Sequence, residues 1–354
     1  MGIKAYLADY RKQANLFLDR FFQKEIDEAK RISPLCREAL EIYREFMRGG
    51  KMARGALTCL GYQSAGGKNQ KAIIQASVAV EIIHSFLLIH DDWIDGDLTR
   101  RGKPTVYTQY GKLHAQRIKK GEGKRWAASM AITLGDVGNW LGYLLLSEAS
   151  FPADLKIKAM ISLGNNLKKT GYGQFLDFTY DLKPGFDWNK ILKIRKLKTA
   201  YYTLVMPLQV GICLAGGSQK QLNAAEKYGF PVGIAFQIQD DYLGFFGDET
   251  KTGKSASADL REGKKTLLIA RALEVLKGQE KKRFKKAIGN RKISSEELGV
   301  VRKLLLDSGV VGYCQQIAED LAQKGKKEIP SLSKQKNLQE TYSSLADYLV
   351  KREK

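Results

Sequence analysis

The residues best suited to chemistry are three aspartates at the end of an apolar stretch, Asp91, Asp92 and Asp95. Residues 72–90 are mostly Ala, Ile, Val, Leu and Phe, which predicts a helix in which Asp91 and Asp95 lie one turn apart on one face. Two carboxylates at this spacing repel each other unless a cation binds them. Magnesium prefers hard oxygen ligands and often takes further ligands from substrate phosphates. A solvated acidic helix end is the alternative for these aspartates taken alone.

Cationic side chains that could bind phosphate lie on both sides of this cluster in the sequence. Arg100 and Arg101 follow it directly, and guanidinium groups suit the oxygens of a phosphorylated ligand. Lys51 and Arg54 come after the paired glycines 49–50, which permit an unusual backbone path and could leave both cations facing one way. An ordinary loop with two exposed cations is the alternative for this second pair.

A second acidic cluster repeats the same order of acids and cations. The run PVGIAFQIQDDYLGFF predicts a helix that carries Gln237, Asp240 and Asp241, and Lys254 and Lys264 follow it in a glycine-bearing loop. The two acidic helices could face each other across a cleft, each holding metal, with the lysines closing over phosphate. Alone, the second cluster would more often be a solvated helix end.

The two clusters resemble the aspartate-rich motifs of the trans-isoprenyl diphosphate synthases, the polyprenyl synthetase family. The first is similar to that family's ExIHxxxLxHDDxxD and RRGxPT, and the second to its FQxxDD and DLREGKKT. The glycine-lysine run resembles GGKRxRP, from which Met52 and Gly55 depart, and Lys198-Thr199 resembles the family's KT pair. Gly244 stands where a third acid of the second motif is common.

The resemblance implies that the chain condenses isopentenyl diphosphate with an allylic diphosphate (dimethylallyl, geranyl or farnesyl) and releases diphosphate. The metal ligands that it implies, for three Mg²⁺ ions, are Asp91, Asp95 and Asp240. The carboxylates that it implies in support are Asp92 and Asp241. The side chains that it implies for the two diphosphates are Lys51, Arg54, His84, Arg100, Arg101, Lys198, Lys254 and Lys264. Thr199 and Gln237 would contact the substrate near the allylic cation.

Phe86 is the residue that we expect to limit product length. It lies five residues before Asp91, about 7.5 Å deeper along the helix, where a ring could form the floor of a tunnel. Plain core packing is the alternative. An aromatic at this position resembles archaeal-type geranylgeranyl diphosphate synthases, whereas animal-type farnesyl synthases tend to have two adjacent aromatics and Leu87 stands second here. We therefore expect a twenty-carbon product, with a farnesyl or a longer-chain synthase as the alternative.

Two more distant functions remain open at this point. A class I terpene cyclase shares the ionisation chemistry but has no use for a second diphosphate site, so Lys51, Arg54 and Arg101 favour condensation. An inactive regulatory subunit or a basic surface-binding protein would be expected to lose metal ligands or phosphate-binding lysines. Apart from the acid replaced by Gly244, none is missing.

The elements that position these residues are expected to be helices throughout. Helical periodicity recurs along the chain, with breaks at Ser33-Pro34, Gly66-Gly67 and Lys183-Pro184-Gly185 and a polar loop or frayed helix at 113–127. No composition break marks a linker. We expect one all-α domain, residues 1–354, with an isoprenoid synthase type bundle of about ten or more helices around a central cleft; the resemblance implies a homodimer.

Composition narrows the partners and the compartment. Lys and Arg outnumber Asp and Glu by 59 to 38, a formal charge of +21, which raises nucleic acid, a membrane surface or anionic substrates as partners. No helix-turn-helix, zinc finger or aromatic-rich RNA motif is present, so no nucleic-acid partner is expected. The four cysteines are scattered, which predicts reduced core thiols. The first residues lack the apolar core of a signal peptide, and the charged and polar side chains within 72–90 argue against a spanning helix. We expect a cytoplasmic protein.

Overall fold

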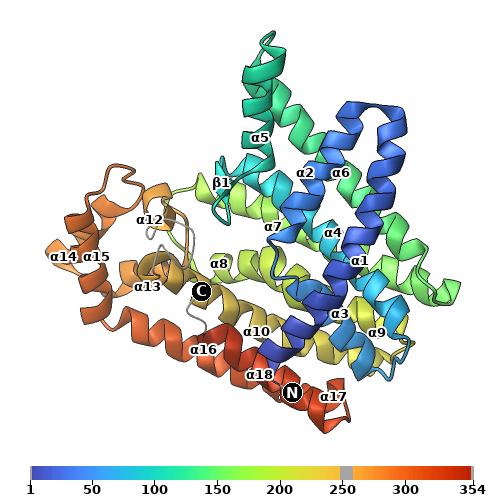
Figure 1. Ribbon diagram of the computed structural model, residues 1–354. Helices are drawn as coiled ribbons and strands as arrows, with labels where there is room; N and C mark the ends of the chain where they lie inside the picture. The colour runs from blue at the N-terminus through green and yellow to red at the C-terminus, as the bar shows by residue number, and fades with distance from the viewer. Residues whose placement is uncertain (1, 248–257, 352–354) are drawn as a thin grey trace. The chain divides into compact units, whose positions relative to one another are not determined.

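Helices make up nearly all the regular structure in the computed structural model, which describes residues 2–247 and 258–351 (Figure 1). The helices are α1 (Ile3–Ile32), α2 (Pro34–Arg48), α3 (Ala53–Ser64), α4 (Gln70–Ile94), α5 (Val106–Leu113), α6 (Gly123–Ser147), α7 (Ala153–Asp181), α8 (Trp188–Arg195), α9 (Met206–Leu214), α10 (Gln219–Phe246), α12 (Ala258–Glu262), α13 (Leu267–Val275), α14 (Gly278–Ala287), α15 (Ser295–Asp307), α16 (Val310–Lys326), α17 (Ile329–Leu332) and α18 (Lys336–Lys351). The segments His114–Ile118 and Lys196–Val205 are π-helical, and β1 (Thr99–Arg100) pairs with β2 (Lys103–Pro104). The expected all-α class is confirmed.

The chain forms two compact units. The N-terminal unit comprises Lys4–Met160 and Val210–Gly217, and the C-terminal unit comprises Ile161–Gln209 and Ser218–Lys354 together with Met1–Ile3. The first acidic cluster belongs to the former and the second to the latter. The single-domain boundary, 1–354, and the central cleft stay predictions.

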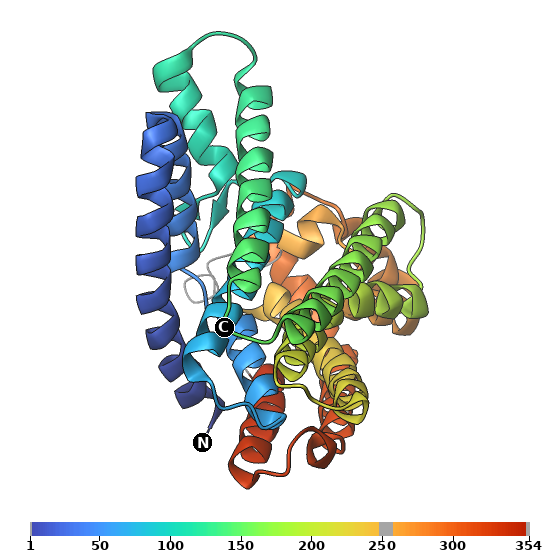
Figure 2. The same cartoon turned by 90° about the vertical axis from the view of Figure 1, so that its right-hand side faces the viewer.

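The predicted helix breaks of the N-terminal unit are confirmed. Ser33 caps α2 by accepting a hydrogen bond from the N–H of Cys36, with Pro34 as the first helical residue. Asn69 caps α4 in the same way, and Gly66, with φ of +89°, turns the chain between α3 and α4. The helices α1 and α2 lie side by side in both views (Figure 1 and Figure 2).

The motif-bearing helix α4 lies in the core of its unit, in contact with α3 and α6. It is the one helix among residues 2–247 and 258–351 that is long and apolar enough to cross a membrane, yet 78% of its most apolar window is buried. Close approach of α6 requires Gly142, where a Cβ would lie 2.5 Å from Ile83 Cγ1. Burial of this length of apolar surface fixes the acidic end of α4 in place.

Residues 113–127 are more ordered than expected. They form the end of α5, a π-helical turn, a short loop and the start of α6. The ring of His114 is buried against Trp126 in this segment, at a centroid distance of 5.6 Å. Its Nε2 lies 2.9 Å from the carbonyl oxygen of Lys120, which holds the returning chain. The pattern of polar residues did not reveal this local packing.

In the C-terminal unit, α10 is the central helix and contacts α16, α18 and the π-helical segment Lys196–Val205. Ser218 and Gln221 begin α10 with reciprocal side-chain to backbone hydrogen bonds. The π-helical segment passes so close to α10 that a Cβ on Gly233 would lie 2.7 Å from Ala200 Cβ. This segment carries Lys198 and Thr199, and its wider turn sets which way their side chains face.

Candidate active site

Two metal-ligand candidates lie at the C-terminal end of α4. The backbone N–H of Asp95 donates to the carbonyl of Asp91 at 2.8 Å, so the predicted spacing of one helical turn is confirmed. Asp91 is half-buried and Asp95 is exposed. Because the C-terminal end of a helix carries negative partial charge, the dipole adds to the repulsion between the carboxylates. The end of α4 therefore suits a divalent cation.

Asp92 has a different environment from its neighbours. Its side chain is 1% exposed, and its Oδ1 accepts a hydrogen bond from Nε of Arg100 at 2.5 Å. Its Oδ2 is buried and has no hydrogen-bond partner among the residues that the structure describes. Burial raises the pKa of Asp92 to about 6, although Arg100 opposes the rise. Asp92 faces inward, in keeping with a supporting role.

The run RRGKPT forms a small hairpin that the sequence did not lead us to expect. Arg100 pairs with Lys103 across the two strands, and the turn between them is Arg101-Gly102, with φ of +54° and +73°. Two left-handed residues in a two-residue turn match the twist of the strands. Thr105 then caps α5 by accepting from the N–H of Thr108. The hairpin therefore brings Arg100 back to Asp92 and puts Arg101 in the turn itself.

Arg54, His84 and Arg101 meet in the N-terminal unit. Nη1 of Arg54 lies 3.0 Å from Nε2 of His84, and since a guanidinium only donates, Nε2 accepts and the imidazole is neutral. Burial, followed by the charges of Arg54 and Arg101, holds the pKa of His84 well below its ordinary value. This cationic cluster, defined by these three side chains, is confined to elements of one unit and is suited to an anionic ligand.

The paired glycines make room for Arg101. A Cβ on Gly49 would lie 3.2 Å from Cδ of Arg101, and one on Gly50 would lie 3.6 Å from its Nη1. The loop of residues 49–52 therefore passes directly beside the hairpin, and Lys51 is exposed on it. Met52 ends the loop in the left-handed region, with φ of +52°.

Sequence reasoning gave no role to Glu81, yet this carboxylate organises the start of α3. Its Oε1 accepts from the N–H of Gly55 at 2.6 Å. Burial raises the pKa of Glu81, and the Gly55 hydrogen bond and Arg54 oppose the rise. The signal was available, because Glu81 is the first residue of the stretch that resembles ExIHxxxLxHDDxxD. Glu81 thereby positions the turn that carries Arg54.

Tyr10 accounts for the departure from the family pattern at Gly55. A Cβ on Gly55 would overlap the Tyr10 hydroxyl, which is buried and donates to Ser77 Oγ at 3.0 Å. The phenol therefore fills the space that a side chain at position 55 would need. Nothing in the sequence around Tyr10 marked it, since the contact joins two helices far apart in the chain.

Phe86 is half-buried on α4 and packs edge-on against His90, with ring centroids 5.2 Å apart. Nε2 of His90 lies 3.0 Å from the carbonyl oxygen of Ile132 in α6, which fixes the histidine ring. Leu87 is also half-buried. Phe86 is thus held by a fixed neighbour, and its role as the floor of a tunnel stays a prediction.

In the C-terminal unit, Lys198 is paired with Asp177. Its Nζ lies 2.6 Å from Asp177 Oδ2, and the two side chains are 22% and 18% exposed. The backbone of Gly173 on α7 lies against the π-helical segment, because a Cβ there would approach the Lys198 nitrogen to 2.5 Å. Gly173 and Asp177, four residues apart on α7, therefore place and hold the Lys198 ammonium.

Thr199, Gln237 and Asp241 form one hydrogen-bonded chain. Thr199 Oγ1 donates to Gln237 Oε1 at 3.2 Å, and Gln237 Nε2 donates to Asp241 Oδ1 at 3.0 Å. Asp241 is 2% exposed, and its Oδ2 accepts from the N–H of Leu267 at the start of α13. Asp241 therefore supports the neighbouring groups and orients the Gln237 amide.

The other site residues predicted for this unit are not members of the Thr199–Gln237–Asp241 chain. Asp240 is half-buried on α10, one residue from the inward-facing Asp241. Lys264 is partly exposed and lies 3.1 Å from Glu262. Lys254 lies outside the residues that the structure describes. Lys265, which sequence reasoning did not single out, is buried and donates to the Tyr180 and Lys183 carbonyls, so it anchors the loop beside Lys264.

The acidic clusters offer few carboxylates each, which suits magnesium that takes its other ligands from a substrate. Within the described part of the chain, no three His, Cys, Asp or Glu side chains come together as a metal site. Each cluster instead offers one or two outward carboxylates, Asp91 with Asp95 and, separately, Asp240. Magnesium is commonly held by one or two carboxylates with substrate phosphates completing the shell. The donor set therefore suits a metal that binds together with a diphosphate.

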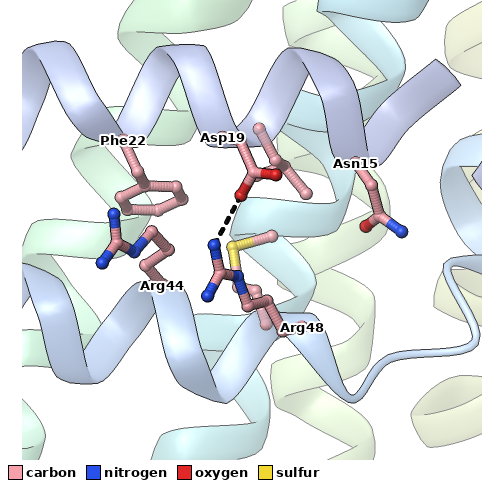
Figure 3. Close-up of a pocket in the computed structure, with 7 residues that line it drawn as sticks. Asn15, Asp19, Phe22, Arg44 and Arg48 are labelled. Carbon is pink, nitrogen blue, oxygen red and sulfur yellow. Dashed lines mark hydrogen bonds and ion pairs between the residues drawn. The ribbon is translucent and has the colours of Figure 1, made fainter. Parts of the chain in front are cut away.

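A pocket of about 210 Å³ between α1 and α2 contains none of these residues (Figure 3). Its walls include Asp19 and Arg48, which are paired at 2.9 Å. Because Arg48 is the last residue of α2, this pair ties the start of the glycine loop to α1. The pocket therefore bears on the position of the loop and is not the candidate active site.

A sequence model of the family described as polyprenyl synthetase matches residues 36–305. The geranylgeranyl diphosphate synthase of Sulfolobus acidocaldarius is 30% identical over 319 residues, which cover 88% of this chain and 90% of the relative. The geranylfarnesyl diphosphate synthase of Aeropyrum pernix is also 30% identical, over 320 residues that cover 86% of this chain and 91% of the relative.

The structural comparison agrees with the sequence comparison. The geranylgeranyl pyrophosphate synthase of Corynebacterium glutamicum, solved with isoprenyl diphosphate and magnesium, superposes with a TM-score of 0.90 at 27% identity. The match covers 99% of this chain and 100% of that one. This likeness confirms the isoprenoid synthase type of fold.

Proposed function

Because the chain belongs to the polyprenyl synthetase family, we propose that it condenses isopentenyl diphosphate with an allylic diphosphate and releases inorganic diphosphate. One observation carries this proposal. The N-terminal unit holds an outward acidic pair, Asp91 and Asp95, and also the separate cationic cluster of Arg54, His84 and Arg101. Two anionic substrates need two such sites, whereas a cyclase needs one.

We propose three Mg²⁺ ions per site, held by Asp91, Asp95 and Asp240 with Asp92 and Asp241 in support. When bound, the ions stabilise the charge that develops on the departing diphosphate. The chain's own cations act in the same direction. Arg100, Lys198 and Lys264, with Lys254, would hold the allylic diphosphate, and stabilisation that grows as the carbon–oxygen bond breaks lowers the barrier.

The second substrate is assigned to the cationic cluster together with Lys51. There the neutral His84 can donate a hydrogen bond without adding charge, while Arg54, Arg101 and Lys51 neutralise the diphosphate of isopentenyl diphosphate. Its double bond then attacks the allylic cation, and the released diphosphate accepts the proton. Thr199 and Gln237 present oxygen atoms near that cation, in the order set by their hydrogen-bonded chain.

We propose a twenty-carbon product, with Phe86 as the floor. The relatives do not decide between lengths, since a geranylgeranyl and a geranylfarnesyl synthase are equally identical to this chain. The support is local. An aromatic ring held edge-on by His90 is a stiffer barrier to a growing chain than an unsupported one. A farnesyl or a longer-chain synthase is the alternative.

We further propose a cytoplasmic homodimer. α6 exposes Val137, Trp140 and Leu144, at 39%, 66% and 58%, and these residues share one helical face. An exposed apolar stripe on a long helix is typical of a contact between proteins. Sedimentation of the purified protein tests this, and Trp140→Glu should shift a dimer to monomer. A wild-type monomer at micromolar concentration would contradict it.

The test of the reaction is mass spectrometry of products formed from Mg²⁺, isopentenyl diphosphate and each allylic diphosphate in turn. We expect a dominant twenty-carbon product. Asp91→Asn and Asp95→Asn should each slow the reaction by at least about a hundredfold. Asp97→Asn, a neighbouring partly exposed carboxylate, is the matched control. If the folded protein condenses none of the allylic starters, the proposed reaction is wrong, and a terpene cyclase or an inactive regulatory subunit becomes the better explanation.

A further inference from the structure

The strongest concentration of unpaired charge in the described part of the chain lies on and around α14. Eight cations and a single acid, Glu280, occupy residues 277–292. The cations are Lys277, Lys281, Lys282, Arg283, Lys285, Lys286, Arg291 and Lys292. None of these side chains makes a hydrogen bond or an ion pair to a described residue, and all but the half-buried Lys281 are exposed. No residue of the candidate active site lies in this segment.

Repulsion among these cations lowers the stability of α14. Lys281 and Lys285, and likewise Lys282 and Lys286, stand four residues apart, where like charges repel. Lys277 occupies the N-cap position without a capping side chain, at the helix end where the dipole disfavours a cation. The helix dipole favours Lys285 and Lys286 in the last turn, but it does not favour Lys277 or the repelling lysines nearer the start, so folding alone does not explain the arrangement.

Neighbouring acids do not neutralise the segment. Figure 1 shows α14 beside α15, and the two helices are in contact. The first turn of α15 holds Glu296 and Glu297, but the carboxylate of Glu297 accepts from the N–H of Ser294 in the cap of that helix. With Glu280 included, three acids against eight cations leave a strong local excess that an external anion would balance.

We propose that α14 and its flanking residues bind the surface of an anionic lipid bilayer. The apolar residues Phe284 and Ala287 are buried within the unit, so the exposed side chains of the helix are cations together with Gln279 and Glu280 near its start. Such a surface adsorbs to anionic headgroups electrostatically and reversibly, without insertion. No aromatic side chain is exposed between residues 277 and 292 to stack on bases, which disfavours single-stranded nucleic acid.

The chemistry of the product favours the same partner, and this step rests on the proposed function. A prenyl diphosphate joins a long apolar chain to a charged head and partitions into a bilayer. An enzyme held at the headgroup surface would release such a product beside the phase that accepts it. The charge argument for α14 does not depend on this step.

The test is cosedimentation of the full chain, without substrate, with vesicles of phosphatidylcholine that contain about 30% phosphatidylserine. We expect binding that is absent with pure phosphatidylcholine and is lost at about 0.5 M salt. The variant Lys281→Gln/Lys282→Gln/Lys285→Gln/Lys286→Gln should bind at least about tenfold more weakly. Glutamine is a good helix former, so the helix should persist.

The matched control removes the same charge elsewhere. Lys119→Gln/Lys120→Gln/Lys124→Gln/Arg125→Gln lies in the exposed loop before α6 and at its start, and should bind like the wild type. The proposal would be overturned if the wild-type protein does not bind anionic vesicles, or if both variants lose binding equally. Displacement of the vesicles by RNA would also overturn it. Condensation of soluble substrates, measured without vesicles, should be unchanged in both variants. Vesicle binding and condensation are thus measured separately, so the proposed membrane surface and the proposed reaction can each be rejected without the other.

Discussion

The Nε of Arg100 donates to the buried Oδ1 of Asp92 at 2.5 Å, which fastens the two-stranded hairpin to the acidic end of α4. We expect Arg100 to bind a diphosphate, and in the structure it also pairs with Asp92, the buried member of the three aspartates at this helix end. The same contact therefore sets the direction of the hairpin turn and of Arg101 beyond it. Two motifs that are separate in sequence are one rigid piece in the structure.

Loss of Arg100 should destabilise the fold as well as the reaction. Arg100→Gln leaves a buried carboxylate without its cation, and we expect the free energy of unfolding to fall by about 3 kcal/mol. The double variant Asp92→Asn/Arg100→Gln removes the buried charge too, so its loss should be smaller than the sum of the single losses. Urea unfolding of the four proteins measures this. Strictly additive losses would show that the two residues are not coupled.

His84 should make stability depend on pH. Its folded-state pKa lies well below the ordinary 6.5, so below that pH the unfolded chain binds a proton that the folded protein does not. The free energy of unfolding should therefore fall as pH falls below 6.5, by about 1.4 kcal/mol per pH unit from this group. Denaturant unfolding at several pH values, compared with His84→Gln, isolates this slope. Parallel curves for the two proteins would rule out a neutral buried His84.

Gly55 and Tyr10 should behave as a complementary pair. Gly55→Ala places a methyl group on the Tyr10 hydroxyl, which should cost about 1–3 kcal/mol of stability. Displacement of the Gly55 N–H from Glu81 should also raise KM for isopentenyl diphosphate, because Arg54 is next to Gly55. Tyr10→Ala/Gly55→Ala makes room for the methyl group, so its KM for isopentenyl diphosphate should lie closer to the wild-type value than that of Gly55→Ala. A double variant no better than the worse single variant would contradict the packing explanation.

Phe86 should control product length. Phe86→Ala removes the ring that packs on His90, and we expect products longer than twenty carbons by mass spectrometry. Phe86→Leu keeps much of the volume and should give a smaller shift. The matched control is Leu88→Ala, a half-buried residue two positions along the same helix. An unchanged distribution in Phe86→Ala would remove Phe86 as the floor.

Much of this protein could be read from the order of its residues. The all-α class, the helix breaks at Ser33-Pro34 and Gly66-Gly67, and the one-turn spacing of Asp91 and Asp95 were predicted and are confirmed. The family was inferred from its motifs and is confirmed by the match over residues 36–305. These features depend on periodicity, capping and short spacings, which are local properties of a chain.

Other features depended on contacts between residues far apart in the chain. Tyr10 occupies the space that a side chain on Gly55 would need, and Gly173 lets α7 approach Lys198; both contacts follow from how helices pack. The ion pair of Asp92 with Arg100 spans only eight residues, but it depends on the hairpin that turns the chain back onto α4. Burial also divides chemically identical aspartates, because Asp240 is half-buried whereas its neighbour Asp241 is 2% exposed. Spacing along the chain determined which groups are present, but only the packed structure decided which of them are desolvated, because desolvation depends on every neighbour in space.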